Sequence, residues 1–365
     1  MVSVFSPKKQ FCSISIILVL LSFSLLPESS AAEKASAIFI FGDSTVDPGN
    51  NNFIPTIFRA NFIPYGIDFP NHVPTGRFTN GKMSTDFLAS YVGIKEFVPP
   101  YLDPSLSIDE LMTGVSFASA GTGFDPLTSH LGNLIGVGKQ LEYFNEYQKR
   151  IEYAIGKEKT KEIVENAVYI VSAGTNDFVL NYFSIPIRKH KYTIPAYMDF
   201  ILFQVHQFIQ GLMEQGARKI GFLGLPPMGC LPAVITLNSV IPISHRGCID
   251  FFSSVAIQYN QKLQMKLNEL QMIRLSDIHP KIVYMDVFNP FLHIINNGQE
   301  YNFTDVNLGC CGTGLLETSL LCNQGSYVCP DASKFMFWDS IHPTEKAYYL
   351  MFKAVQPAVD YLLKD

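Results

Sequence analysis

The side chains of this chain that could do chemistry fall in four short motifs. In chain order they are Gly42-Asp43-Ser44, Gly121 in a turn of small residues, Gly174-Thr175-Asn176-Asp177, and Asp339-x-x-His342. A serine hydroxyl becomes a nucleophile when an imidazole accepts its proton, and a carboxylate can hold that imidazole in the required tautomer. The set therefore predicts nucleophilic attack by a serine on an acyl carbon.

Ser44 is the candidate nucleophile. It lies three residues beyond an apolar run, residues 37–41, that reads as a buried strand. Gly42 lets the backbone turn sharply there, so the hydroxyl can stand above the end of the strand. The alternative is that Ser44 caps a helix, a position that serine favours.

His342 is the candidate base, and Asp339 is its candidate partner. The carboxylate stands three residues before the imidazole, within reach of its far ring nitrogen. Such contact fixes the tautomer and stabilises the imidazolium as it forms. Pro343 disfavours helical geometry at His342, so we expect a helix to begin near Thr344 and the pair to occupy the loop before it. The alternative is a structural Asp–His pair on a surface turn.

Gly121 and Asn176 are candidate donors to an oxyanion. The N–H groups of Ser44 and Gly121 and the side-chain amide of Asn176 could supply three hydrogen bonds to a tetrahedral intermediate. Loss of one such donor costs roughly 10²–10³ in rate. The alternatives are an ordinary turn glycine and an Asx-turn.

Apolar runs of strand length alternate with helical patterns along the chain. The expected strands are residues 37–41, 115–118, 168–172, 219–223 and 281–285, and the expected helices are residues 82–91, 139–154, 196–215, 250–273 and 344–363. This alternation predicts an α/β fold with a parallel sheet of about five strands and helices on both faces. The first three motifs follow strands, at the sheet edge where ligands bind in such folds.

The first 32 residues have the pattern of a secretory signal peptide. Lys8 and Lys9 precede an apolar segment, residues 11–26, and Ser30-Ala31-Ala32 is a small-residue cleavage site. The apolar run is shorter than the roughly 20 residues of a membrane-spanning helix. We expect residues 33–365 to form a single domain without a transmembrane segment. The alternative is a membrane anchor.

The composition narrows the class of partner. The 365-residue chain has a formal net charge of −5 and no basic stripe, so nucleic acid is not an expected partner. A low charged fraction of 16% and an aromatic content of 13% favour a packed enzyme over a disordered chain.

Six cysteines follow the predicted signal: Cys230, Cys248, Cys310, Cys311, Cys322 and Cys329. An even number in a secreted chain predicts up to three disulfides, although six cysteines allow about 15 pairings. Cys230 and Cys248 make a plausible local pair, and the adjacent Cys310 and Cys311 need different partners, with Cys322 and Cys329 as candidates. A zinc site is the alternative. Asn302 begins the only Asn-x-Ser/Thr sequon and is a candidate for glycosylation.

Taken together, the four motifs resemble the sequence blocks of the GDSL, or SGNH, hydrolases, and most closely those of the plant secreted GDSL esterase/lipases. Three further segments share this resemblance: Pro74-Thr75-Gly76-Arg77-Phe78, Gly224-Leu225-Pro226-Pro227-Met228-Gly229-Cys230 and Phe337-Trp338-Asp339-Ser340-Ile341-His342-Pro343. The resemblance implies a three-layer α/β/α flavodoxin-like fold and ester hydrolysis without a metal or organic cofactor. It also implies a glycoprotein of the apoplast or cell wall that acts in lipid metabolism.

The resemblance assigns roles to the motif residues. It makes Ser44 the nucleophile, His342 the base and Asp339 the third member of a triad, with Gly121 and Asn176 beside the Ser44 amide in the oxyanion hole. Asp43 and Asp177 are expected to brace their turns. The chain departs from the family pattern at Thr45, where leucine is usual, at Ser116, where asparagine is common, and at Ala120, where glycine is usual.

Three functional hypotheses follow. The first is a secreted serine esterase or lipase that acts on carboxylic esters, with acyl lipids among the candidates. The second is an acyltransferase that uses the same residues and passes the acyl group to an alcohol. The third is a secreted binding protein that has the fold without the activity. The sequence specifies neither the ester nor the oligomeric state.

Overall fold

The computed structural model describes residues 1–4, 35–239, 246–272 and 280–364. The predicted signal peptide, residues 1–32, lies outside this part of the chain except for its first four residues. None of the helices within the described ranges has the length and apolar character needed to cross a membrane.

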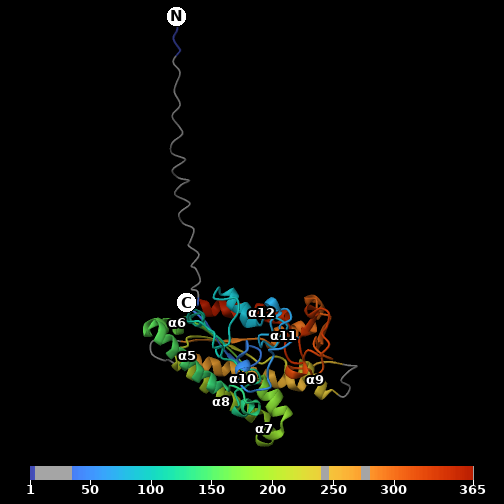
Figure 1. Cartoon of the computed structure of the whole chain (residues 1–365). Coiled ribbons are helices and arrows are strands. Elements are labelled where there is room, and N and C mark those ends of the chain that lie inside the picture. The colour runs from blue at the N-terminus through green and yellow to red at the C-terminus, as the bar shows by residue number, and fades with distance from the viewer. Residues whose placement is uncertain (5–34, 240–245, 273–279, 365) are drawn as a thin grey trace.

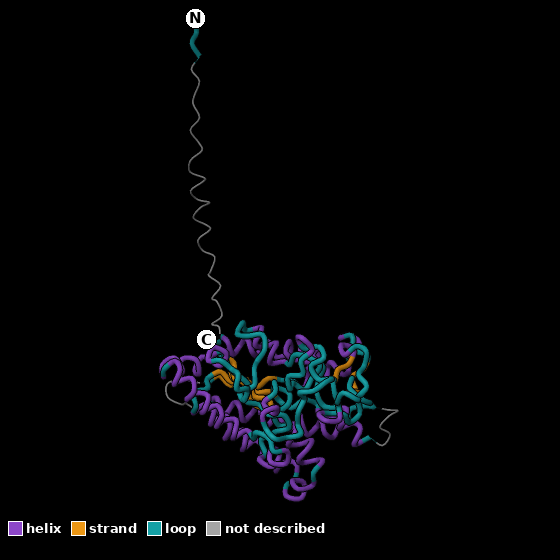
Figure 2. The backbone as a smooth tube through the Cα atoms, in the orientation of Figure 1, coloured by secondary structure: helices purple, strands orange, loops and turns teal. Residues whose placement is uncertain are grey.

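A parallel four-stranded sheet forms the centre of the fold (Figures 1 and 2). Its strands lie in chain order: β1 (Ile38–Gly42), β2 (Val168–Ser172), β3 (Lys219–Leu223) and β4 (Lys281–Met285). Every residue of β1 is buried, as expected of a parallel strand covered on both faces. The carboxyl ends of the strands therefore meet at one edge of the sheet.

Helices cover both faces of this sheet and confirm the three-layer α/β/α architecture. One face carries α5 (Val137–Ile155), α8 (Ile194–Glu214) and α10 (Asp250–Gln271) (Figure 1). The other face carries α12 (Glu345–Leu363), which packs on β3 and β4 and against α2 (Ser84–Tyr91). All five predicted helices are present, with ends within a few residues of those expected.

The structure also contains helices that the apolar periodicity did not indicate. They are α3 (Ile108–Met112), α4 (Pro126–Gly132), α6 (Lys157–Asn166), α7 (Pro186–Lys191), α9 (Pro232–Asn238), α11 (Phe288–Asn296) and the π-helix Asp177–Ser184. Single 3₁₀ turns occur at Asn50–Phe53, Pro70–His72, Met228–Cys230, Gly298–Tyr301, Ser319–Leu321 and Ala332–Lys334. Most of these elements are too short for a 3.6-residue period to appear in the sequence.

The fifth expected strand, residues 115–118, is a bridged segment rather than a regular strand. Ser116 forms single parallel bridges to Ile40 and to Pro100. The segment still follows β1, because Ile40 N donates to Val115 O (3.1 Å) and Phe117 N donates to Ile40 O (2.8 Å). This pairing carries the loop that contains Gly121 to the same edge of the sheet as Ser44.

A small second sheet lies apart from the first, next to the C-terminal motif (Figure 2). It pairs β5 (Asp305–Gly309) with β6 (Phe335–Phe337) in parallel. The chain between these strands contains two disulfides, Cys310–Cys329 and Cys311–Cys322. The two covalent loops brace the segment that leads through β6 to Asp339.

The third disulfide joins Cys230 to Cys248, the predicted local pair. Cys310 and Cys311 have different partners, as expected. All six cysteines after the signal are thus in disulfides, so the alternative of a zinc site built from them is wrong.

Candidate active site

The turn after β1 places Ser44 at the carboxyl edge of the sheet. Gly42 has a φ of 141°, and a Cβ atom at this position would overlap the carbonyl oxygen of Ser172 on the neighbouring strand. Asp43 N donates to that oxygen at 2.9 Å, which fixes the start of the turn. The next helical turn begins only at Asn50, so Ser44 does not cap a helix.

Asp43 and Thr45 hold the turn from either side of Ser44. The Asp43 carboxylate accepts hydrogen bonds from Thr45 N (3.0 Å) and Thr45 Oγ1 (2.8 Å), and the threonine hydroxyl also bonds the Ser172 hydroxyl at 2.9 Å. Burial raises the pKa of Asp43 to about 6. Thr45, where the family commonly has leucine, therefore gives this turn two polar contacts.

His342 links Ser44 to Asp339. Its Nε2 atom lies 2.8 Å from Ser44 Oγ, and its Nδ1 atom lies 2.9 and 2.8 Å from the two oxygens of Asp339. Asp339 is fully buried and His342 is only 4% exposed, so the alternative of a surface pair is wrong. The helix that follows is α12, which begins next to Thr344 as predicted, and Thr344 is its N-cap.

The Asp339 carboxylate is held as an anion by its surroundings. Its Oδ1 atom accepts from the backbone N–H groups of Ile341 (2.8 Å) and His342 (2.7 Å). Burial acts to raise the pKa of Asp339, but the His342 imidazole and these hydrogen bonds lower it below the ordinary value. An anion in this position can stabilise an imidazolium.

Two donors to Asp339 were not predicted from the sequence. Tyr65 Oη donates to Oδ2 at 2.7 Å, and Thr318 Oγ1 donates to the same oxygen at 3.0 Å. The tyrosine oxygen also accepts from Ser319 N at 2.8 Å. Tyr65 is 274 residues from Asp339 in the chain, so no local spacing could have indicated this contact.

The candidate oxyanion donors line one hollow together with Ser44 and His342. In the part of the chain that is described, neither the Ser44 nor the Gly121 amide N–H donates to a protein acceptor. Asn176 Nδ2 donates one hydrogen to Thr122 O (2.9 Å), which orients the amide and leaves its second hydrogen available. This bond to a separate segment is not an Asx-turn. Three N–H donors thus line the hollow beside the serine.

Gly121 lies in a left-handed conformation with a φ of 86°. A Cβ atom there would come within 2.9 Å of Leu134 Cδ1 and 3.0 Å of Phe58 Cδ1. The position is therefore restricted both by backbone conformation and by space.

Buried polar contacts tie the 3₁₀ turn that follows the first motif to the segment that leads to Gly121. Asn50 Nδ2 donates to Ser116 O (2.8 Å) and Ala118 O (2.9 Å), and Asn51 Nδ2 donates to Ala120 O (3.0 Å). The family's usual residues at positions 116 and 120 are replaced here, but these contacts use backbone carbonyls and do not depend on the side chains.

Asp177 ties the second motif to the third. Its carboxylate accepts from Phe124 N (2.8 Å), Asp125 N (3.0 Å) and Thr128 Oγ1 (2.6 Å), all in the chain that follows Gly121. Burial raises the pKa of Asp177 to about 7. These contacts agree with a bracing role for this residue.

Asn302 lies away from these motifs, at the end of a 3₁₀ turn, with a φ of 60° and an exposed side chain. The sequon is therefore accessible from solvent.

Comparison with known proteins gives consistent matches. A sequence model of the family described as GDSL-like Lipase/Acylhydrolase matches residues 38–355. A GDSL esterase/lipase of Arabidopsis thaliana is 54% identical over 336 residues, which are 92% of this chain and 89% of the relative. A second GDSL esterase/lipase of that plant is 44% identical over 327 residues, 90% of each chain.

Among solved structures, a catalytic mutant of an acetylxylan esterase from Geobacillus stearothermophilus aligns with this chain. The alignment covers 90% of this chain and 95% of that one, at 13% identity and a TM-score of 0.41.

Proposed function

Because the chain belongs to the GDSL lipase/acylhydrolase family and is an ester hydrolase, we propose that Ser44, His342 and Asp339 are its catalytic triad. The observation that carries this proposal is the unbroken hydrogen-bonded chain from Ser44 Oγ through the imidazole to the buried carboxylate. A nucleophile, a base and a group that orients the base are the parts that acyl transfer to a serine requires.

In the first step, Ser44 Oγ attacks the carbonyl carbon of the ester and its proton passes to His342 Nε2. The carbonyl π bond opens, and the negative charge develops on the former carbonyl oxygen. The tetrahedral intermediate then collapses, the bond to the alcohol oxygen breaks, and His342 gives its proton to that oxygen. The products are a free alcohol and an ester of the acyl group with Ser44.

In the second step, water attacks the acyl carbon and gives a proton to His342 Nε2. Collapse of the second intermediate breaks the bond to Ser44 Oγ, and the proton returns to the serine. Asp339 remains ionised throughout, because its pKa is held low, and it stabilises the imidazolium in both steps.

The oxyanion of each intermediate is bound by the N–H groups of Ser44 and Gly121 and by the second amide hydrogen of Asn176. Neither backbone donor bonds another group within the described chain, so both can bond an oxyanion without breaking a protein contact. Donors fixed in advance stabilise developing charge without reorganisation.

Water is the proposed acceptor. The relatives that share 44–54% of the sequence are named esterase/lipases, which does not favour transfer to an alcohol. A binding protein without activity would have no need for a complete and correctly connected triad.

We further propose that the protein is secreted after removal of residues 1–32 and that residues 33–365 form one domain. Three disulfides and an accessible sequon at Asn302 support an oxidising, extracellular destination. Amino-terminal sequencing of protein secreted from plant cells, with and without glycosidase, tests the cleavage site and the glycan. An intact residue 1 in the secreted protein would refute the signal peptide.

Hydrolysis of a panel of p-nitrophenyl esters tests the catalytic assignment. Wild-type protein is expected to turn over at least one ester, and Ser44→Ala is expected to lose about 10⁶ in kcat. Ser105→Ala is a matched control, because that serine is exposed and outside the site. Activity of Ser44→Ala equal to that of the control would exclude Ser44 as the nucleophile.

A further inference from the structure

Two hollows meet at Ser44. The first is lined by Ser44 with His342 and Gly121, and therefore faces the proton donor and an oxyanion donor. The second is a cavity of about 110 Å³ between the carboxyl end of the sheet and helices α2 and α12. Ser44 and Asn176 line both hollows, whereas His342 and Gly121 line only the first.

The chemistry decides which part of an ester enters which hollow. His342 must give its proton to the oxygen of the departing alcohol, so the alcohol has to lie on the imidazole side of Ser44. That side is the first hollow. The acyl chain points away from the alcohol across the carbonyl carbon, and the second cavity is the hollow at Ser44 that His342 does not line.

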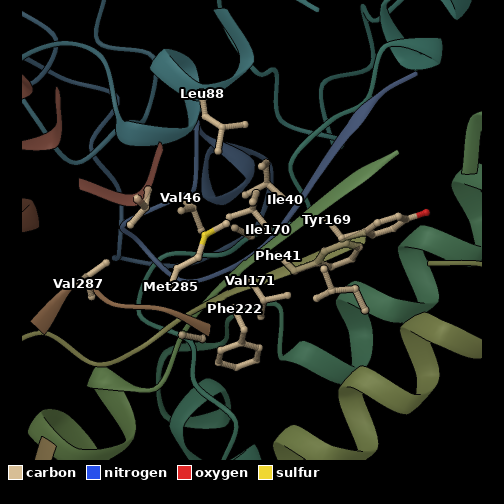
Figure 3. Close-up of a cluster of buried hydrophobic side chains, with 14 of the residues drawn as sticks. Ile40, Phe41, Val46, Leu88, Tyr169, Ile170, Val171, Phe222, Met285 and Val287 are labelled. Carbon is tan, nitrogen blue, oxygen red and sulfur yellow. The ribbon is translucent and has the colours of Figure 1, made fainter. Parts of the chain in front are cut away.

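Most residues that line the second cavity are apolar, and the polar ones are Asp43, Ser44, Thr45, Ser84, Thr85, Ser172, Thr175, Asn176 and Tyr348. Leu88 of α2, Ile170 of β2 and Met285 at the end of β4 point toward one another on one side of the sheet (Figure 3). Met351 and Val355 of α12 complete the wall. Transfer of a methylene group from water to such a site raises the binding constant about fourfold, so these walls suit a hydrocarbon chain.

The dimensions limit the length of that chain. A cavity of about 150 Å³ in another protein holds benzene, so a cavity of about 110 Å³ corresponds to roughly four or five carbons. Along α12, the wall runs from Tyr348 to Val355, a rise of about 10 Å. Since a carbon–carbon bond of about 1.5 Å advances a zigzag chain by roughly 1.25 Å, this span limits the chain to about eight carbons.

Two of the polar groups that line the cavity are buried hydroxyls on the helices α2 and α12. Thr85 of α2 and Tyr348 of α12 line the cavity and are 3% and 4% exposed, and neither side-chain oxygen has a hydrogen-bond partner among the described residues. The two helices are joined here, since Ser84 Oγ donates to the Tyr348 carbonyl at 2.8 Å. Buried hydroxyls without partners are costly, and an oxygen on a ligand in this cavity would give both hydroxyls a partner.

We propose that this cavity is the acyl site, and that it accepts acyl groups of about four to eight carbons that carry an oxygen substituent such as a hydroxyl. The inference rests on the proposed function, because it takes Ser44 as the nucleophile and His342 as the donor to the leaving alcohol. Thr85 and Tyr348 are then the residues that select the substituted chain over the plain one.

The first test measures chain length. Ethyl esters of 2 to 14 carbons are hydrolysed by wild type, Leu88→Phe, Leu88→Ala and Phe58→Leu, with acid release followed by titration. Wild-type kcat/KM is expected to peak between four and eight carbons and to fall at least tenfold by twelve. Leu88→Phe should move the peak to shorter chains and Leu88→Ala to longer ones. Phe58→Leu, in the first hollow, should leave the acyl profile unchanged.

The second test measures the oxygen preference. Ethyl hexanoate is compared with ethyl hydroxyhexanoates that carry the hydroxyl at carbons 3 to 6, using wild type and the double variant Thr85→Val/Tyr348→Phe. Wild type should prefer at least one hydroxy ester by about tenfold, and the double variant should reduce this ratio to about twofold or less. The plain ester serves as the internal control for folding.

The outcomes separate the two proposals. A chain-length profile that does not respond to either Leu88 variant, or a wild type without preference for any hydroxy ester, would overturn the inference while the Ser44-dependent hydrolysis remained. Hydrolysis that survives Ser44→Ala would instead overturn the proposed function.

Discussion

Substitution of Tyr65 by phenylalanine tests whether the carboxylate of the proposed triad depends on its buried hydrogen-bond donors. The tyrosine hydroxyl donates to Asp339 Oδ2 at 2.7 Å and accepts from Ser319 N at 2.8 Å. Burial and the nearby Asp339 charge raise the pKa of Tyr65 well above its ordinary value, so the proton stays on the tyrosine and the hydroxyl acts as a donor. Tyr65 is thus a positioning residue that acts through Asp339.

The magnitude follows from the contacts that remain. A hydrogen bond to a charged group is worth about 1.5–3 kcal/mol. Asp339 Oδ2 keeps Thr318 as a donor and the carboxylate keeps two backbone N–H groups, so we expect the low end of this range. About 1.5 kcal/mol corresponds to roughly a tenfold fall in kcat. Loss of the acceptor for the Ser319 N–H is expected to cost a further 1–3 kcal/mol or so in the free energy of unfolding.

The pH profile separates positioning from simple destabilisation. A carboxylate with one hydrogen-bond donor fewer attracts a proton on the imidazole more strongly. The acidic limb of the plot of kcat/KM against pH should therefore move to higher pH. The assay is the pH dependence of p-nitrophenyl ester hydrolysis, with urea unfolding in parallel and Tyr327→Phe, an exposed tyrosine, as the control. Thr318→Val should shift the limb in the same direction. A Tyr65→Phe enzyme with kcat within twofold of wild type and an unchanged limb would refute the reasoning.

Three further predictions concern the same machinery. Asp339→Asn should lower kcat by about 10⁴ while the fold persists, because the amide cannot hold the required imidazole tautomer. Ester hydrolysis measures the activity and circular dichroism checks the fold. A fall in kcat of less than tenfold would contradict this prediction. Gly121→Ala should lower kcat by about 10² with a smaller change in KM. The reason is that a Cβ atom at a φ of 86° crowds Phe58 and displaces an oxyanion donor. Unchanged steady-state kinetics would argue against a role for the Gly121 amide in binding the oxyanion. In the folded state the pKa of Asp177 is about 7, against an ordinary 3.8, so its contribution to stability is fully present below about pH 4 and is lost as the pH rises through 7. Urea titrations should therefore show that Asp177→Asn loses less stability than wild type between pH 5 and 8. Parallel plots of unfolding free energy against pH for the two proteins would contradict the assignment.

The sequence was most informative where local pattern and covalent spacing decide the structure. Residues 37–41 are apolar throughout and residues 168–172 are apolar except for Ser172, and the two runs correspond to strands β1 and β2 of the parallel sheet. Pro343 correctly indicated that Asp339 and His342 lie in a loop and that a helix begins near Thr344. The cysteine spacing indicated the pair Cys230–Cys248 and separate partners for Cys310 and Cys311, but it left open which of these two bonds Cys322 and which bonds Cys329.

The sequence was less informative where long-range contacts decide the structure. The segment at residues 115–118 reads as a strand, but Ser116 bridges to two different segments, so regular pairing is interrupted. Tyr65 and Thr318 reach Asp339 only because the loops that carry them fold back over it. The cavity proposed for the acyl group likewise depends on the packing of α2 against α12, which no local pattern encodes.

The most direct measurement for the central claim is covalent labelling of the folded protein with a fluorophosphonate, followed by mass spectrometry of the peptides. The hydrogen-bonded chain from Asp339 through His342 to Ser44 predicts one phosphonylated residue, Ser44, with labelling abolished in His342→Ala. Label on another serine, or equal labelling of Ser44 in the two proteins, would contradict the account.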